Sequence, residues 1–388
     1  MRRLWLPGIA LLLFAAVGLW VVRWTSSPLT EPGGLDIAEV LGGASDAGFA
    51  RAYDVRAFRF PRDYGPHPRF RDEWWYFTGN LFSDDGRRFG YELTFFRIAL
   101  TPRAPERISH WATNQLYLGH FALTDAAGRR FHYFELFSRG ALGLAGAQSE
   151  PFGVWLNDWG VRAERHRPDV WRLTASEDDV ALTLALSPAK PIVLQGDRGL
   201  SRKSAEAGNA SYYYSRPRLT SEGTIMLAGR QFRVHGTSWL DREWGTSALA
   251  RDEVGWDWFA LQLSDGWDLM FYQLRRADGS RAPYSAGTLI DPAGRATPLK
   301  ARDVSIEPLG NWRSPRGGTY PARWRLAVPS AALALEVTPV LADQELAVSV
   351  RYWEGAVNVS GTHGGDHVQG VGYSELTGYA TSAARPRR

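Results

Sequence analysis

The sequence predicts an all-β protein, with two tandem antiparallel β-barrel domains behind an N-terminal hydrophobic helix. Its 388 residues are enough for two domains that each bury a core. The 17 Trp and 40 Gly favour strands and tight turns. After position 50 the chain alternates short strand-like runs with Asp/Gly turns, and no amphipathic helical run of about a dozen residues occurs. A third observation, an internal repeat, divides the strands between two domains.

The repeat consists of stretches that recur in the same order. Trp74, Phe77 and Leu81 recur as Trp256, Phe259 and Leu263, and a Ser-Asp turn follows both copies. About eight short strands per copy suit a small barrel whose interior holds one ligand. The other matched pairs are Leu123–Arg129 with Leu289–Arg295, Trp171–Leu173 with Trp324–Leu326, Leu182–Pro188 with Leu333–Pro339, and Val234–Thr237 with Val359–Thr362.

The N-terminus predicts a signal anchor over residues 1–24. Leu4 to Val22 carries no charge, and as a helix it would span about 28 Å, close to the thickness of a bilayer core. Arg2 and Arg3 precede it and would stay in the cytoplasm, which places the body in the periplasm. A cleaved signal peptide and a buried soluble helix are the alternatives.

Residues 25–54 follow the anchor and predict a linker with a short helix that begins at Asp36. The first barrel domain then covers residues 55–248 and the second covers residues 249–382. The boundary follows the run from Asp241 to Gly245, where the second copy of the repeat is about to begin.

Composition narrows the function. Three of the 45 Lys and Arg flank the apolar run, which leaves 42 against 41 Asp and Glu in the body. No basic stripe stands out, so nucleic acid is not an expected partner. The absence of cysteine excludes disulfides and thiolate metal sites, and fits an exported bacterial β-protein. The motifs of nucleophilic hydrolases, zinc proteases, phosphate binding and dinucleotide binding are also missing, so we expect neither cofactor nor metal.

The strongest chemical cluster is the pair Asp241 and Glu243. On a strand, side chains alternate between faces, so these two carboxylates lie side by side and Arg242 faces away from them. Like charges held close raise one pKa, which would supply a proton donor and acceptor near neutral pH. The alternative, which the pattern favours, is a salt-bridged strand end that joins the two domains.

Two further residues are candidates for assisting catalysis. Glu73 precedes Trp74 and Tyr76, and burial against their rings would raise its pKa. Alternatively, Glu73 pairs with backbone or Arg groups at the start of the strand. His120 is the best histidine for acid–base work, although a lone strand histidine is more often a satisfied core or rim residue.

Aromatic residues near these positions are candidates for binding a lipophilic ligand, and core packing is the alternative. The predicted ligand-binding residues are Trp74, Tyr76, Tyr214, Trp239, Trp244, Trp256, Tyr272 and Glu375.

Several stretches together resemble one bacterial family, the lipocalin-like family of carotenoid 1,2-hydratases and predicted secreted hydrolases, often encoded beside ABC-type permeases. The similarity covers about residues 55 to 380. The stretches are Phe60–His67 running into Glu73–Gly79, Gly199–Lys203, Ala210–Leu219, Trp239–Gly245, Gly255–Phe259 and Tyr373–Tyr379.

The resemblance implies two tandem lipocalin-like barrels and, in the hydratase branch, addition of water to a carbon–carbon double bond of a carotenoid. That branch has a histidine where this chain has Arg242, within an Asp-His-Asn-Trp-Gly run. Arginine is always protonated and cannot act as the acid. This departure favours the secreted branch.

The sequence therefore predicts a membrane-anchored, periplasmic protein that binds a lipophilic small molecule, with an ABC-type permease as a partner. The alternative is a cofactor-independent hydrolase or hydratase. In that case Asp241 and Glu243 act as acid and base, assisted by Glu73 and His120.

Overall fold

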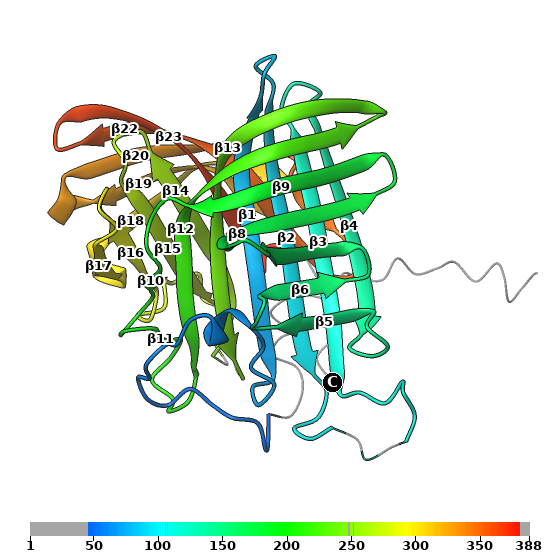
Figure 1. Ribbon diagram of the computed structural model, residues 1–388. Coiled ribbons are helices and arrows are strands. Elements are labelled where there is room, and N and C mark those ends of the chain that lie inside the picture. Colours follow the sequence, from blue (N-terminus) through cyan, green and yellow to red (C-terminus); the bar gives the residue numbers. More distant parts are fainter. Residues whose placement is uncertain (1–45, 105, 107, 247–248, 251, 381–388) are drawn as a thin grey trace, which may run out of the picture.

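The computed structural model describes residues 46–380 apart from 105, 107, 247, 248 and 251. Within this part the chain forms 23 β-strands and three short 3₁₀ helices (Figure 1). The prediction of an all-β protein is confirmed. The 3₁₀ helices are η1 (Arg62–Tyr64), η2 (Ala301–Asp303) and η3 (Pro329–Ala331).

The first 13 strands form one antiparallel sheet in the order β4-β3-β2-β1-β13-β12-β9-β8-β7-β6-β5, and β10 and β11 also pair with β12. They are β1 (Asp72–Ser83), β2 (Arg88–Ala99), β3 (Gln115–Asp125), β4 (Arg130–Arg139), β5 (Ala145–Gln148), β6 (Gly153–Leu156), β7 (Trp159–Glu164), β8 (Arg167–Glu177), β9 (Val180–Pro188), β10 (Val193–Leu194), β11 (Leu200–Arg202), β12 (Ala210–Leu227) and β13 (Arg230–Gly245).

The remaining ten strands form a second antiparallel sheet in the order β17-β16-β15-β14-β23-β22-β20-β19-β18, and β21 pairs with β22. They are β14 (Glu253–Leu263), β15 (Asp268–Arg276), β16 (Ala286–Ile290), β17 (Ala296–Lys300), β18 (Ser305–Arg313), β19 (Thr319–Val328), β20 (Leu333–Pro339), β21 (Glu345–Ala347), β22 (Arg351–His363) and β23 (Asp366–Leu376).

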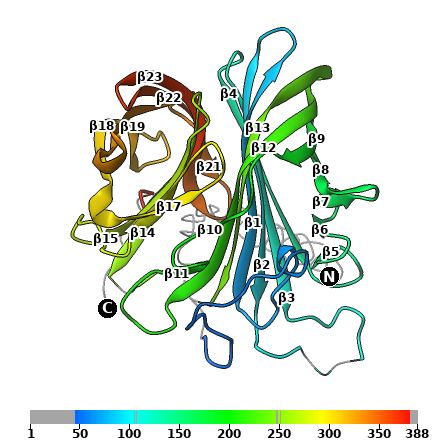
Figure 2. The ribbon, with the colours of Figure 1, turned by 60° about the vertical axis from the view of Figure 1, so that its left-hand side comes forward.

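Each sheet curls around its own hydrophobic core into a barrel-like shape (Figure 2). The end strands of each path do not pair with each other among the described residues, so neither sheet is closed by hydrogen bonds. Buried indoles fill both interiors, for example Trp75 and Trp171 in the first sheet and Trp324 and Trp353 in the second. The expectation that a barrel interior holds the ligand is therefore wrong, because large side chains occupy that space.

The two sheets pack against each other through their central strands. Strands β1, β2 and β12 of the first sheet contact β23, β22 and β14 of the second (Figure 2). The side-chain amide of Asn80 donates a hydrogen bond to the carbonyl oxygen of Gly372 at 3.0 Å. A Cβ on Gly90 would come within 2.4 Å of the Cβ of Ala356, so glycine is required there for the sheets to approach.

Successive side chains of the first strand of each sheet point alternately into the core of that sheet and into the space between the two sheets, so both faces of the strand are apolar. On β1, Trp75 and Phe77 enter the core of the first sheet, whereas Tyr76 packs between the sheets. On β14, Phe259 enters the core of the second sheet, whereas Trp258 packs between the sheets. Strands buried on both faces carry near-continuous apolar runs, and this accounts for the aromatic density of both stretches.

Four of the five repeat matches fall on topologically equivalent strands: β1 with β14, the β3–β4 turn with the β16–β17 turn, β8 with β19, and β9 with β20. The fifth match is wrong. Val234–Thr237 lies on β13, which pairs with the first strand of its sheet, whereas Val359–Thr362 lies on β22. The true counterpart of β13 is β23, because β23 pairs with β14 as β13 pairs with β1.

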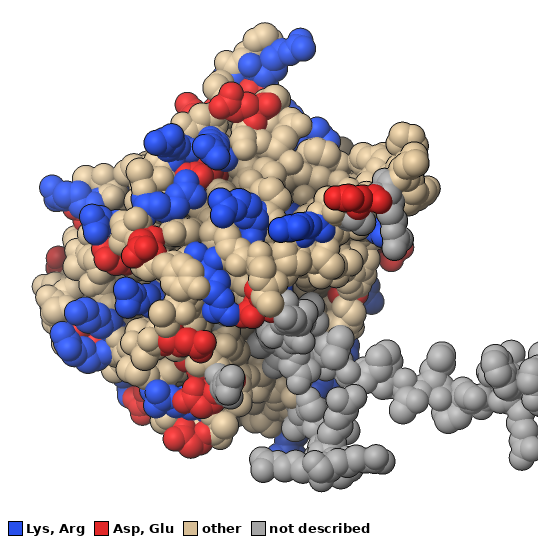
Figure 3. Space-filling model, turned by 90° about the horizontal axis from the view of Figure 1, so that it is seen from below, with Lys and Arg blue, Asp and Glu red and all other residues tan. Residues whose placement is uncertain are grey.

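The predicted N-terminal anchor and the short helix at Asp36 lie outside the described residues. In the described part, no helix has the length and apolar character needed to cross a membrane. The face shown in Figure 3 carries Lys and Arg side chains interspersed with Asp and Glu.

Candidate functional site

A cleft lies between the two sheets, on the faces of β1, β13 and β14 that point away from the barrel cores. Its empty volume is about 760 Å³, which includes the part that opens to solvent. Most of its wall is aromatic, and four carboxylates and one lysine are its charged groups. The lining residues are Trp74, Tyr76, Phe96, Lys203, Tyr213, Asp241, Glu243, Leu249, Trp256, Trp258, Tyr272, Leu274, Tyr352, Glu354 and Glu375.

The pairing register places matching groups on the two walls. In the first sheet Tyr76 lies opposite Asp241, and in the second sheet Trp258 lies opposite Glu375. Tyr76 and Trp258 occupy equivalent positions of the repeat, and their rings meet edge to face at 5.1 Å. Asp241 and Glu375 are therefore equivalent carboxylates, one on each wall of the cleft.

Asp241, on β13, lines the first wall of the cleft and is 3% exposed. It accepts hydrogen bonds from the hydroxyl groups of Ser215, at 2.5 Å, and Tyr213, and from the indole of Trp239, at 2.7 Å. Burial raises the pKa of Asp241 to about 7, although the three donors act in the opposite direction and Glu243 adds a smaller upward effect. Asp241 is therefore able to donate or accept a proton near neutral pH.

Glu243 lies beside Asp241 on the same face of β13, as the alternation predicted. It forms an ion pair with Lys203 at 3.0 Å and accepts a hydrogen bond from the Ser211 hydroxyl. Burial lowers the pKa of Lys203, but the neighbouring Glu243 carboxylate outweighs it and the pKa is raised. Lys203 is therefore a fixed positive charge, and its ammonium lies 4.4 Å from the ring centre of Tyr272.

Three more carboxylates gather where β2, β22 and β23 meet. Glu354 and Glu375 are directly opposite each other on β22 and β23. The Tyr76 hydroxyl donates to Glu354 at 2.9 Å, and the Trp256 indole donates to Glu375 at 3.0 Å. Burial raises the pKa of Glu354 well above its ordinary value, and the neighbouring Glu375 and Glu92 carboxylates raise it further.

His120 lies behind the cleft wall and is completely buried. Its Nδ1 is 2.6 Å from the hydroxyl oxygen of Tyr352, a lining residue, and its Nε2 is 3.1 Å from Glu135. Burial lowers the pKa of His120, and Glu135 only partly offsets this effect. When His120 is neutral and donates its Nε2 hydrogen to Glu135, its Nδ1 accepts a hydrogen bond from the Tyr352 hydroxyl. His120 is therefore connected to the cleft by its hydrogen bond to Tyr352.

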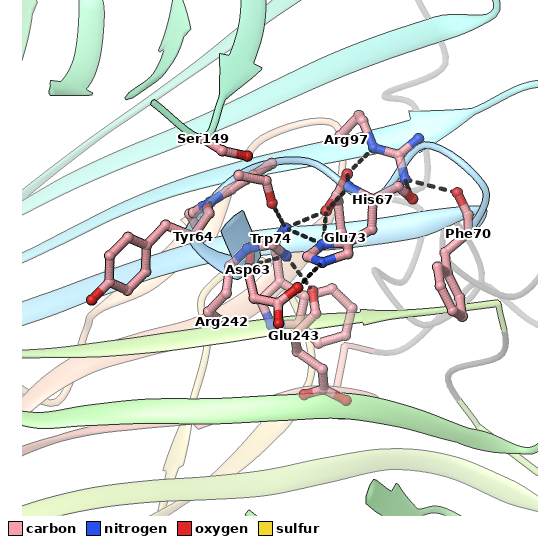
Figure 4. A network of polar contacts seen from close by, with 12 residues as sticks. Asp63, Tyr64, His67, Phe70, Glu73, Trp74, Arg97, Ser149, Arg242 and Glu243 are labelled. Atoms are coloured by element: carbon pink, nitrogen blue, oxygen red, sulfur yellow. Dashed lines mark hydrogen bonds and ion pairs between the residues drawn. The ribbon is translucent and has the colours of Figure 1, made fainter. Parts of the chain in front are cut away.

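Glu73 is not part of the cleft, because it projects from the opposite face of β1 (Figure 4). It forms ion pairs with Arg97 and Arg242 and accepts a backbone hydrogen bond from His67 at 3.0 Å. The raised pKa expected for Glu73 is wrong: burial does raise the pKa, but the two guanidinium groups outweigh it and hold the pKa well below its ordinary value. The alternative, pairing with Arg at the strand start, agrees with the structure.

Arg242 also faces away from the cleft, as predicted. Its guanidinium lies 3.9 Å from the ring centre of Trp75 and donates to the carbonyl oxygen of Gly65 at 2.7 Å. Trp244, on the same face, stacks on His67 at 3.8 Å. These contacts fasten residues 59–71 to the inner face of the first sheet.

The predicted ligand-binding residues divide between three places. Five line the cleft: Trp74, Tyr76, Trp256, Tyr272 and Glu375. Trp239 packs between the sheets and donates to Asp241. Tyr214 and Trp244 belong to the core of the first sheet, because their positions on β12 and β13 point inward.

Sequence reasoning missed Lys203, Trp258, Tyr352, Glu354 and Glu92. Trp258 could have been predicted, because it lies within the repeated stretch two residues after Trp256 and therefore on the same face of the strand. No pattern in the sequence indicates Glu354, because its pairing with Glu375 depends on the register of β22 against β23. Aligning β22 with β13 also concealed the equivalence of Glu375 and Asp241. Within the described residues, no group of three or more His, Cys, Asp or Glu side chains could hold a metal ion.

The two curled sheets and the cleft between them define a lipocalin-like β-protein with two barrel-like sheets. The sequence profile of AttH-like proteins matches residues 51–379, and the chain belongs to this family. The predicted resemblance to lipocalin-like hydratases and their relatives is confirmed. No curated protein sequence matches the chain.

Solved structures agree with this assignment. A protein described as an AttH from Nitrosomonas europaea is 36% identical, with a TM-score of 0.76 over 85% of this chain and 99% of the other. Kievitone hydratase from Nectria haematococca is 15% identical, with a TM-score of 0.66 over 87% of this chain and 99% of the other. CghA with Sch210972 is 12% identical, with a TM-score of 0.50 over 86% and 97%. The last two show a shared fold.

Proposed function

We propose that the cleft is the active site of a cofactor-independent acid–base enzyme that adds water to, or removes water from, an apolar unsaturated small molecule. The observation that carries this proposal is Asp241, a carboxyl buried in an aromatic cleft with a pKa raised to about 7. Placing an ionisable group there costs stability, and such costs are typical of sites selected for chemistry.

In the direction of hydration, protonated Asp241 transfers its proton to one carbon of a double bond, and the π bond breaks. The positive charge that develops on the other carbon lies near the faces of Trp258 and Tyr213, where aromatic rings stabilise cations. A water oxygen then bonds to that carbon, and its surplus proton passes to a carboxylate of the Asp241–Glu243 pair. Dehydration is the reverse, and both directions balance without an oxidant or reductant.

Lys203 and the buried hydrogen-bond donors have positioning roles in this scheme. Ser215, Tyr213 and Trp239 hold Asp241 in one orientation, and Lys203 holds Glu243. Kievitone hydratase shares this fold, which supports a hydratase reaction, and CghA has been crystallised with Sch210972. The class of substrate follows from the mainly aromatic lining of the cleft.

The second candidate is a non-catalytic carrier for a lipophilic molecule, in which the same groups serve only as structure. The missing nucleophile motifs favour it, and so does the mainly aromatic lining.

In either case we propose that residues 1–24 anchor the protein in the inner membrane with its body in the periplasm, and that an ABC-type permease is a partner. Carbonate extraction of membranes, with and without residues 1–24, tests the anchor.

Enzyme and carrier are separated by turnover in water labelled with heavy oxygen. The protein is incubated with total membrane lipid extract, and bound and free species are analysed by mass spectrometry. A hydratase produces species that have gained one labelled water, and Asp241→Asn abolishes them while the exposed control Asp84→Asn does not. A ligand recovered unlabelled, equally from wild type and Asp241→Asn, would rule out the enzyme and support the carrier.

A further inference from the structure

One end of the cleft carries buried carboxyl groups that the acid–base chemistry of Asp241 does not use. Glu354 of the second sheet lines this end, and Glu92, on β2 of the first sheet, is close enough to raise the pKa of Glu354. Glu92 and Glu354 are both completely buried. Oε1 of Glu354 has no hydrogen-bond partner, and neither Glu92 nor Glu354 forms an ion pair in the described part of the chain. A hydrogen bond from the Thr94 side chain lowers the pKa of Glu92, but burial raises it by more. Lys203, the lysine of the cleft, is already paired with Glu243.

The position of these carboxyl groups makes their ionised forms unfavourable. Glu354 lies directly opposite Glu375 on the neighbouring strand, an arrangement in which two like charges destabilise a sheet. A buried carboxylate without a partner is itself unfavourable, and Glu92 and Glu354 are both completely buried. A fold alone requires neither feature, so a ligand that supplies the missing positive charge explains both.

Aromatic rings from both sheets surround the same carboxylates. Tyr76 and Trp256 hold Glu354 and Glu375 through hydrogen bonds, and Trp74 and Tyr352 complete this end of the lining. Carboxylates among aromatic faces form the type of site that recognises substituted ammonium ions, because the ring faces attract a cation that carries bulky alkyl groups.

We propose that this end of the cleft binds the positively charged nitrogen of an alkylammonium group, so that the ligand is a lipophilic amine or a quaternary ammonium compound. The inference deepens the proposed function and rests on it only in using the same cleft. It names the class of substrate, or of carried ligand, and it does not depend on proton transfer by Asp241.

Proton linkage follows from the electrostatics. Without a ligand, burial raises the pKa of Glu92 and of Glu354 well above the ordinary value, and the neighbouring carboxylates add to it. A bound cation stabilises the ionised forms, so binding releases protons and becomes tighter as the pH rises. The titratable groups of the cleft and of the strands packed against this site are Tyr76 on β1, Glu92 on β2, Lys203 after β11, Asp241 and Glu243 on β13, Tyr352 and Glu354 on β22, and Tyr373 and Glu375 on β23. His120 on β3 lies behind Tyr352.

The test uses choline and its neutral isostere 3,3-dimethylbutanol, which has carbon in place of the charged nitrogen. Both are titrated calorimetrically into the full chain at pH 6 and pH 8, in buffers of low and high ionisation enthalpy. We expect choline to bind about ten-fold more tightly than the alcohol. Its affinity is expected to rise between pH 6 and pH 8, with protons released to the buffer.

Glu354→Gln removes one charge with little change in volume and is expected to erase the preference for choline. The exposed Glu336→Gln, on the outer face of β20, is the matched control and should retain it. Equal or weaker binding of choline, an affinity that falls with pH, or an unchanged preference in Glu354→Gln would each overturn the inference. Asp241→Asn keeps choline binding and loses turnover, so failure of the proposed reaction is recognised separately.

Discussion

Replacing Asp241 by Asn should change how the stability of the protein depends on pH. The folded-state pKa of Asp241 is raised to about 7 from the ordinary value of 3.8. A carboxyl whose pKa is raised on folding stabilises the protein fully below the lower value, and this contribution is lost as the pH rises through the higher one. Asn cannot ionise, so the variant does not show the loss.

The size of the effect follows from the two pKa values. Between pH 5 and pH 8 the free energy of unfolding of the wild type should fall by about 3 kcal/mol more than that of Asp241→Asn. Glu92 and Glu354 also have raised pKa values, but they are present in both proteins and cancel in the comparison. In Asp241→Asn the hydrogen bonds from the Ser215 and Tyr213 hydroxyl groups are weaker, which lowers the free energy of unfolding by about 1–3 kcal/mol at every pH. This shifts the plot of unfolding free energy against pH without changing its slope.

Urea denaturation followed by tryptophan fluorescence at pH 5, 6, 7 and 8 measures this difference directly. Asp84→Asn, in the exposed turn after β1, is the matched control and should follow the wild type. Parallel curves for wild type and Asp241→Asn would refute the reasoning, because Asp241 would then titrate alike in the folded and unfolded chains.

Three further substitutions test the surroundings of the cleft. Glu73→Gln should lower the free energy of unfolding by about 3–5 kcal/mol, because two buried guanidinium groups lose their partner, and a loss below 1 kcal/mol in urea titrations would contradict this. Tyr352→Phe should cost about 1–3 kcal/mol by the same measurement, since His120 Nδ1 loses its donor, and an unchanged midpoint would show that this bond is unimportant. Gly90→Val should force the sheets apart at Ala356 and weaken choline binding in calorimetry, and undiminished affinity would argue against a site between the sheets.

Features carried by local periodicity could be predicted from the sequence. Alternation along one strand was enough to place Asp241 and Glu243 together and Arg242 on the other face. The repeated Trp74 and Trp256 stretches correctly marked the first strand of each sheet. These inferences depend only on neighbours along the chain and on the period of two in a strand.

Features that depend on packing between distant strands could not be predicted. Both barrel interiors are filled, and the cleft forms only where the outer faces of β1 and β14 meet. Glu73 looked like a carboxylate among indoles, but its partners are Arg97, directly opposite it on β2, and Arg242, which comes from β13, far away in sequence. The pairing of Glu354 with Glu375 depends on a strand register that no local pattern specifies.

A crystal structure of the protein soaked with choline shows whether the ligand site lies between the sheets. We expect the ammonium group beside Glu354, in contact with the faces of Trp74 and Trp256. Choline found inside either barrel core, or no bound choline at concentrations that saturate binding in solution, would contradict it.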